Sequence, residues 1–320
     1  MGNLTSGGVT ISRSWLPPWA SALAAVGILV ALGVQLGAGP FLSALASISV
    51  GAILAAAVIT AGTTWACARR WSILADRLGV GLTSAAAYRA YYRAQFLNAT
   101  LPSGVVGEVD RAVWHGHSSA SMSRGIRSVV WDRVTGQAVL FGLTVLAIPA
   151  MAAPLRTWLL WLLVAALAIA VAAAMSGSSF AQALRDEARD VPGAPGVWSQ
   201  VLLLSTLAVV GHVAVFVVAA RAVGVSASLL DLAALGLVVL QISSIPLSIA
   251  GWGPREGGAA LVFGAAGLDA STGLAVSVTY GVLATLATLP GVLALRRRRA
   301  SGPAGDPEGG TSWVIAPTRS

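Results

Sequence analysis

The sequence predicts an all-α protein that crosses a membrane several times, and composition and apolar run length are the observations that predict it. Hydrophobic residues fill 56% of the 320 positions and charged residues only 10%, whereas a soluble domain carries about 25% charged residues. Mean hydropathy is +0.80. Uninterrupted apolar runs recur at about 20 residues, which is the length a helix needs to cross the hydrocarbon core. Lipid rather than water is therefore the expected main solvent.

The apolar runs predict about six full transmembrane helices and two broken ones. The full spans are predicted at residues 19–36, 44–67, 129–151, 157–175, 198–220 and 272–295. Weaker apolar stretches at about 84–117 and 229–267 are interrupted by proline and glycine at 101–107 and 245–258. Because proline ends a helix and glycine favours turns, we predict two short helices around each break.

Arginine supplies every basic residue, and its positions predict the orientation in the membrane. The positive-inside rule places Arg13 and the arginines of residues 69–77, 124–127 and 296–299 in the cytoplasm, so both termini are expected there. Arginines in short loops, rather than in one basic patch, do not indicate a nucleic-acid partner. The lysine-free, alanine-rich composition is typical of a bacterium with a GC-rich genome. With the predicted spans, it leads us to expect a multi-pass protein of the bacterial plasma membrane.

This orientation requires the two broken segments to be re-entrant hairpins that enter from opposite sides. Residues 1–18 are then a cytoplasmic segment, 19–152 and 153–295 are two membrane halves related as an inverted repeat, and 296–320 form a basic, then disordered, cytoplasmic tail. The alternative is a set of ordinary spans without this symmetry. Arg156 and Arg221, which the repeat places on the outer side, favour that alternative.

Charged residues gather at the first break, where an apolar environment makes each of them costly. Glu108, Arg111 and His115 share one helix face by their spacing, which predicts a polar stripe turned away from lipid. Arg89 and Arg93 lie one turn apart in the preceding arm and repel each other unless an anion lies between them. Phosphate fits this role because guanidinium binds it bidentately. The alternative is an interfacial arm whose arginines and tyrosines reach lipid headgroups.

The second break places Gly253, Arg255 and Glu256 at the start of a short helix. Free N–H groups and the positive helix end at such a position favour an anion. Asp132 and Arg133 form another charge pair at the cytoplasmic end of a predicted span, where a membrane-edge anchor is the simplest interpretation.

Catalytic and metal-binding patterns are not found in the sequence. Cys67 is the single cysteine, and His115 and His117 lack a third ligand of the usual kind. His212, in the middle of an apolar span, is expected to bond a backbone carbonyl, with proton relay as the alternative. Because no recognised nucleophile motif occurs, we expect no enzymatic activity, no cofactor and no metal.

The residues at the two breaks resemble the lysylphosphatidylglycerol synthase transmembrane region family of flippase-like integral membrane proteins. The resemblance covers about residues 20–295. It lies in Tyr92 to Asn98 running into Leu101-Pro102-Ser103-Gly104, Gly107-Glu108 and Arg111, in Val130-Trp131-Asp132-Arg133, and in Pro246 to Gly257. Asp132 stands where the family usually has glutamate.

The resemblance implies a lipid or lipid-linked substrate. The soluble aminoacyl-transfer domain of full synthases and the glycosyltransferase fused to some relatives are not found in these residues, so lipid lysylation by this chain alone is not expected. Together with the polar pattern, the resemblance implies that substrate is bound by Arg89, Arg93, Asn98, Pro102, Gly104, Gly107, Glu108, Arg111, Arg133, Pro246, Gly251, Gly253, Arg255 and Glu256.

Three functions are consistent with this pattern. The leading hypothesis is a transporter or flippase that moves an anionic phospholipid or a polyprenyl-linked glycolipid, with the headgroup phosphate held between the hairpins by Arg111 and Arg255. Glu108 and Glu256 would neutralise these arginines when substrate is absent. The second is a non-transporting partner that presents lipid to a glycosyltransferase or lipid-modifying enzyme. The third is an intramembrane enzyme that acts on lipid phosphate.

Overall fold

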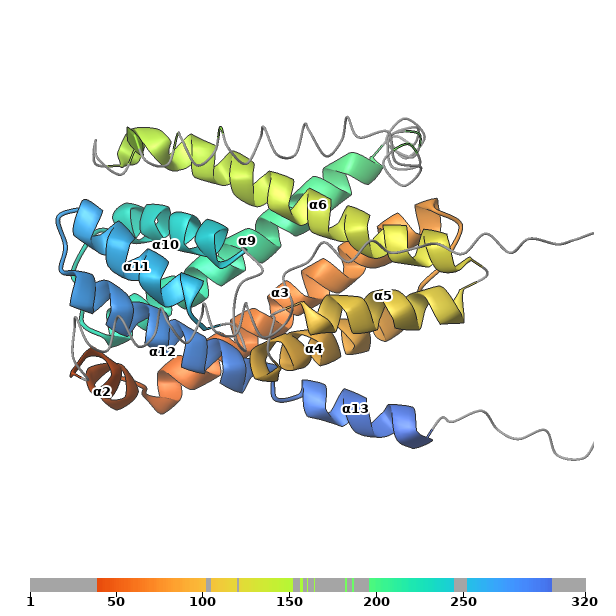
Figure 1. Cartoon of the computed structure of the whole chain (residues 1–320), viewed down its shortest axis with the longest axis horizontal. Coiled ribbons are helices and arrows are strands. Elements are labelled where there is room, and N and C mark those ends of the chain that lie inside the picture. The colour runs from red at the N-terminus through yellow and green to blue at the C-terminus, as the bar shows by residue number, and fades with distance from the viewer. Residues whose placement is uncertain are drawn as a thin grey trace, which may run out of the picture.

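The computed structural model describes residues 39–101, 105–119, 121–151, 196–244 and 252–300, with isolated positions between 156 and 186. The described part is all-helical (Figure 1). Its elements are α2 (Gly39–Ala46), α3 (Val50–Arg77), α4 (Ser84–Thr100), α5 (Val106–Ser118), α6 (Met122–Ala147), the short 3-10 helix η1 (Ile148–Ala150), α9 (Val197–Ala222), α10 (Leu229–Ser243), α11 (Pro254–Ala265), α12 (Ala270–Thr288) and α13 (Gly291–Ala300).

Four of these helices, α3, α6, α9 and α12, are long and apolar enough to cross a membrane. The 28 residues of α3 measure about 42 Å at 1.5 Å per residue, which exceeds the roughly 30 Å of hydrocarbon. These helices confirm four of the predicted spans, with shifted boundaries. The predicted spans 19–36 and 157–175 lie wholly or largely outside the described residues. The chain is a multi-pass membrane protein.

Each broken segment contains two helices, as the sequence predicts. The first comprises α4 and α5 on either side of residues 101–105, and the second comprises α10 and α11 on either side of residues 244–253. The hydroxyls of Thr83 and Ser228 accept backbone N–H bonds at the starts of α4 and α10, which satisfies donors that have no partner within the helix. Gly253, the residue that caps the start of α11, has a φ of 115°, a conformation that favours glycine.

One predicted loop is wrong. We expected Arg69, Arg70 and Arg77 in a cytoplasmic loop, but all three lie in the last turns of α3. Arg69 is exposed, whereas Arg70 is buried against neighbouring helices. Hydropathy ends a span at the first charged residues, but the helix continues because Arg70 has a buried carboxylate partner.

An aromatic cluster holds α9, α10, α11 and α12 together. Phe216 and Phe263 are fully buried with ring centroids 6.4 Å apart, and Tyr280 lies 6.2 Å from Phe216. A Cβ atom at Gly236 would lie 2.9 Å from the Phe216 ring, so glycine permits this contact. Since lipid tails are as apolar as this core, close packing rather than removal from water stabilises the arrangement.

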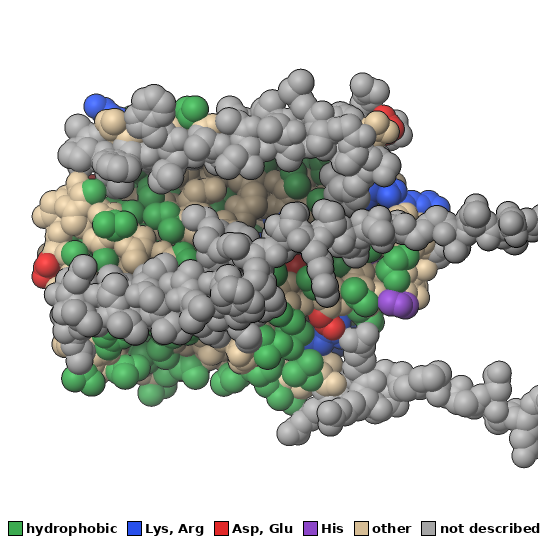
Figure 2. All heavy atoms as spheres, in the orientation of Figure 1, with side chains coloured by type: hydrophobic (Ala, Val, Ile, Leu, Met, Phe, Trp, Pro, Cys, Tyr) green, Lys and Arg blue, Asp and Glu red, His purple; other side chains and the backbone are tan. Residues whose placement is uncertain are grey.

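The outer surface of the helices is largely apolar. Figure 2 shows hydrophobic side chains over much of the visible described face, with charged ones mainly toward its two ends. Val58, Leu146 and Leu261 are each more than 70% exposed. Large exposed apolar side chains on long apolar helices are the expected contacts with lipid tails.

The two broken pairs lie toward opposite ends of the helical body. In Figure 1, α3, α6 and α9 run along its length, α4 and α5 lie beside one end, and α10 and α11 lie beside the other. Helix α12 packs against α3, α9 and α11 and also contacts α4. The body is therefore continuous between the two pairs.

Candidate functional site

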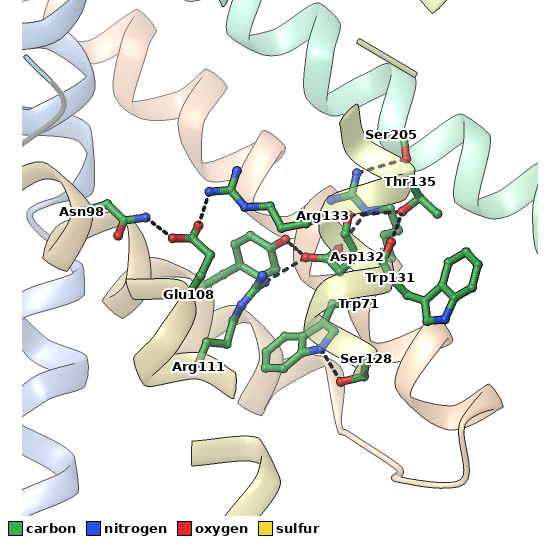
Figure 3. A network of polar contacts seen from close by, with 12 residues as sticks. Trp71, Asn98, Glu108, Arg111, Ser128, Trp131, Asp132, Arg133, Thr135 and Ser205 are labelled. Carbon is green, nitrogen blue, oxygen red and sulfur yellow. Dashed lines mark hydrogen bonds and ion pairs between the residues drawn. The ribbon is translucent and has the colours of Figure 1, made fainter. Parts of the chain in front are cut away.

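Asp132 is the centre of a buried network that joins five helices (Figure 3). One carboxylate oxygen accepts a bond from Arg70 Nε at 2.8 Å, and the other pairs with Arg111 Nη1 at 3.0 Å and accepts the Tyr91 hydroxyl. Arg70 also donates to Ser205 Oγ at 3.0 Å. Asp132 is 0% exposed, and both arginines are buried. Two arginines thus share one carboxylate, so this network carries one excess positive charge.

Aromatic rings hold the Arg111 guanidinium in place. Its central carbon lies 4.6 Å from the Trp71 ring centroid and 4.0 Å from that of Tyr91, within the range of cation–π attraction. Trp71 is itself anchored, since its indole N–H donates to Ser128 Oγ at 3.1 Å. The Arg111 Nε atom is buried and bonds to none of the described residues. The site therefore presents a fixed cation that retains a donor.

Asn98 connects the two arms of the first broken pair. Its side-chain oxygen accepts the Gly107 N–H at 2.7 Å. Its side-chain nitrogen donates to Glu108 at 2.8 Å (Figure 3). A Cβ atom at Gly107 would lie 2.1 Å from the Ala94 carbonyl oxygen, so only glycine permits this approach. Glu108 also pairs with Arg133 at 2.9 Å. This outer ion pair is partly exposed, with Arg133 45% and Glu108 22% accessible.

A second ion pair joins the same arms. Arg93 of α4 donates from Nε to Asp110 of α5 at 2.6 Å, and it lies 5.8 Å from the Trp114 ring. Arg93 is buried, whereas Arg89, one turn earlier, is exposed. The two arginines therefore do not share one environment.

The second broken pair carries a separate buried network at the start of α11. The Glu256 carboxylate accepts the Gly253 N–H at 2.6 Å, Arg255 Nη2 at 2.6 Å and Ser277 Oγ at 3.2 Å. Glu256 is 0% exposed. A Cβ atom at Gly281 would lie 2.1 Å from Arg255 Nη2, so that glycine makes room for the guanidinium. The pair is electrically balanced, unlike the Asp132 network.

The predicted site residues divide among these networks. The structure brings Asn98, Gly107, Glu108, Arg111 and Arg133 together at the first break, and Gly253, Arg255 and Glu256 together at the second. Arg93 forms its own ion pair with Asp110 between the same two helices, and Arg89 lies at the surface. Pro102, Gly104, Pro246 and Gly251 lie outside the described residues.

One expected pairing is different. We expected Glu108 to neutralise Arg111 because they share a helix face, but Arg111 pairs with Asp132 and Glu108 pairs with Arg133. An arginine side chain reaches several ångströms beyond its own helix, so the carboxylate on α6 competes with the one on α5. The expected Arg255–Glu256 pair is present.

Sequence reasoning missed three central residues. Arg70 was assigned to a loop, Tyr91 to the membrane interface, and Asp132 to a membrane-edge anchor. The predicted span 129–151 placed Asp132 near its end, whereas the residue lies ten residues inside α6, a depth at which a carboxylate needs cationic partners. His212 makes no hydrogen bond to the described residues, so the carbonyl bond expected for it is not seen there. Within the same part of the chain, no group of three or more His, Cys, Asp or Glu side chains could hold a metal ion.

The fold and the two networks define a class: multi-pass helical membrane proteins with paired broken helices whose charged residues are buried in the helical body. The profile of the family described as "Lysylphosphatidylglycerol synthase TM region" matches residues 19–291. The chain belongs to this family. A search of curated proteins found no match.

Proposed function

We propose that this protein moves a lipid with an anionic headgroup, either a phospholipid or a polyprenyl-linked glycolipid, across a bacterial plasma membrane. The observation that supports this most directly is the excess positive charge around Asp132, where two buried arginines meet one carboxylate. A buried cation without a full counterion is costly in a membrane protein. A phosphate group would supply the missing negative charge and would accept the free Arg111 N–H.

The placement of the broken pairs supports an alternating route. The pairs lie beside opposite ends of the body, and the second helix of each contributes a buried arginine to an ion pair, Arg111 of α5 with Asp132 of α6 and Arg255 with Glu256 at the start of α11 (Figure 1). We propose that they are opposed re-entrant hairpins of an inverted repeat, with both termini cytoplasmic. Arg111 would receive phosphate from one leaflet and Arg255 would receive it nearer the other, while the acyl or prenyl tails stay in lipid.

A protein with this function must lower the free-energy barrier that the headgroup meets when it crosses the membrane. A phosphate that crosses bare hydrocarbon loses its hydration at a cost of several kcal/mol or more. Buried guanidinium groups replace water at each stage of the path. We propose transport without a chemical reaction on the lipid, and the lipid as the partner molecule.

Transport can be measured in vesicles that contain purified protein and a fluorescent anionic lipid in one leaflet. We expect faster equilibration with wild type, and a loss of about tenfold or more in Arg111→Gln and Arg255→Gln. Arg221→Gln is the control, because this arginine is exposed at the end of α9. If no anionic lipid moves faster in folded protein, the non-transporting partner that presents lipid to an enzyme becomes the better hypothesis. Release of free phosphate would instead indicate an intramembrane enzyme.

The proposed topology has its own test. Single cysteines at positions 103 and 248, in a background with Cys67→Ala, should react with impermeant thiol reagents from opposite sides of the membrane. Cys67 is buried, so its removal leaves the surface unchanged. Labelling of both positions from one side only would refute the inverted repeat.

A further inference from the structure

Neutral polar side chains gather where α10 ends and the second break begins. Ser244 Oγ lies within hydrogen-bond distance of Gln137 Oε1 of α6, at 3.3 Å, and of the Leu240 carbonyl oxygen of its own helix, at 3.1 Å. Gln241 lies three residues before Ser244, so both side chains share one face of the helix. All three are half-buried, and none belongs to the two ionic networks. We call Gln137, Gln241 and Ser244 the amide cluster.

Gln241 gives the strongest indication that the amide cluster has a ligand. Its side-chain oxygen is buried and has no hydrogen-bond partner among the described residues. A buried polar atom without a partner costs about 1–3 kcal/mol, and proteins leave few of them. The preceding residues of α10 are almost all apolar, so a leucine at position 241 would fit the helix at lower cost. A group that donates a hydrogen bond to this oxygen would remove the cost.

The amide cluster is next to the arginines. Gln137 lies one helical turn, or about 6 Å, beyond Arg133 on α6. Its neighbour Gly136 packs on the Arg70 guanidinium, since a Cβ atom there would lie 3.0 Å from Arg70 Nη1. A phosphodiester bound at Arg133 would therefore lie about one helical turn from Gln137, which is within reach of a headgroup substituent.

We propose that the amide cluster recognises hydroxyl groups on the headgroup of the transported lipid. Amides and hydroxyls offer both donors and acceptors without charge, which matches the donors and acceptors of a polyol, whereas an ammonium group can only donate and an alkyl group can do neither. Glycerol and a sugar share this chemistry. The inference rests on the proposed function for the lipid phosphodiester, and it names the substituent that this phosphodiester carries.

Binding to purified protein tests this with lipid pairs matched in charge. The first pair is phosphatidylglycerol and phosphatidylmethanol, and the second is a polyprenyl phosphate hexose and methyl polyprenyl phosphate. We expect the hydroxylated member of at least one pair to bind about threefold to tenfold tighter, the range for one or two neutral hydrogen bonds. The pair that shows the preference identifies the source of the hydroxyls.

Leucine variants identify the residues that cause the preference for the hydroxylated lipid. Gln241→Leu and Gln137→Leu should bring the ratio within that pair close to one and leave binding of the methyl lipid unchanged. Gln200→Leu, on the exposed first turn of α9, is the matched control and should keep the wild-type ratio. A thermal unfolding midpoint measured for each variant verifies folding, and Ser244→Ala gives a second, smaller change at the same cluster.

Equal affinity within both pairs for wild type would overturn the inference. So would a preference that survives both leucine variants, because selectivity would then lie elsewhere. Transport of phosphatidylglycerol and phosphatidylmethanol at equal rates would keep the proposed function and remove this recognition site. Selective binding that the leucine variants abolish, without transport of either lipid, would keep the site and reject transport.

Discussion

Replacing Asp132 with asparagine tests whether the five-helix network holds the protein together. The change keeps the size of the side chain and removes its charge. Arg70 and Arg111 then face each other across a neutral amide in a site where Asp132 is 0% exposed. The excess positive charge of the network rises from one to two.

The structure sets the magnitude of this effect. Removing one partner of a buried ion pair costs about 3–5 kcal/mol, mostly because the other charge stays buried without compensation. The two direct contacts, at 2.8 and 3.0 Å, place Asp132→Asn in this range. Asp132→Glu keeps the charge and adds one methylene, so we expect only the overpacking cost of about 1–3 kcal/mol.

Reversible unfolding in mixed micelles with increasing dodecyl sulfate measures the free energy of unfolding of each variant. Arg70→Met added to Asp132→Asn should recover part of the loss, because it returns the excess charge to one. A free energy for Asp132→Asn within about 1 kcal/mol of wild type would refute the reasoning, since it would mean that water already screens the network. The same conclusion would follow if the loss of unfolding free energy in the double variant equalled the sum of the losses in Asp132→Asn and Arg70→Met.

Further predictions follow from individual contacts. Gly107→Ala should destabilise by several kcal/mol because its Cβ would lie 2.1 Å from a carbonyl oxygen, whereas Gly142→Ala, with nothing within 4 Å, should stabilise α6 by up to about 1 kcal/mol in the same unfolding assay. Asn98→Ala should cost about 1–3 kcal/mol, because a backbone N–H loses its acceptor, and a smaller loss would mean that water replaces it. Glu256→Gln should cost about 3–5 kcal/mol and Glu108→Gln at most about 1 kcal/mol, because only the first carboxylate is fully buried; equal losses would contradict this.

Local sequence patterns predict the helical elements of this protein well. Apolar run length predicts α3, α6, α9 and α12, and proline with glycine predicts the breaks between α4 and α5 and between α10 and α11. Both signals act within one segment, through the membrane thickness and the backbone conformations that a residue permits. The close pair Arg255–Glu256 was predictable for the same reason.

Pairing between helices could not be predicted from these patterns. Arg111 has a carboxylate, Glu108, three residues before it on its own helix, yet its partner is Asp132 on α6. Arg70 lies where hydropathy ends the span, and only the fold reveals that Asp132 and Ser205 surround it. The spacing of residues along one helix indicates the face of that helix on which a side chain lies. Which neighbouring helix that face contacts depends on how the five helices pack, and the spacing does not contain this information.

The contact between Gly107 and the Ala94 carbonyl also determines where the first helix pair can bend. Asn98 bonds across the same break, so α4 and α5 are joined close to the point where one ends and the other begins. A change in the angle between α4 and α5 would break these contacts, and we expect the pair to move as a rigid unit instead. Its pivots are then the links to α3, where Gly79 adopts a φ of 67°, and to α6. Spin labels on the two arms should keep their separation during transport, whereas labels on α3 and α4 should not.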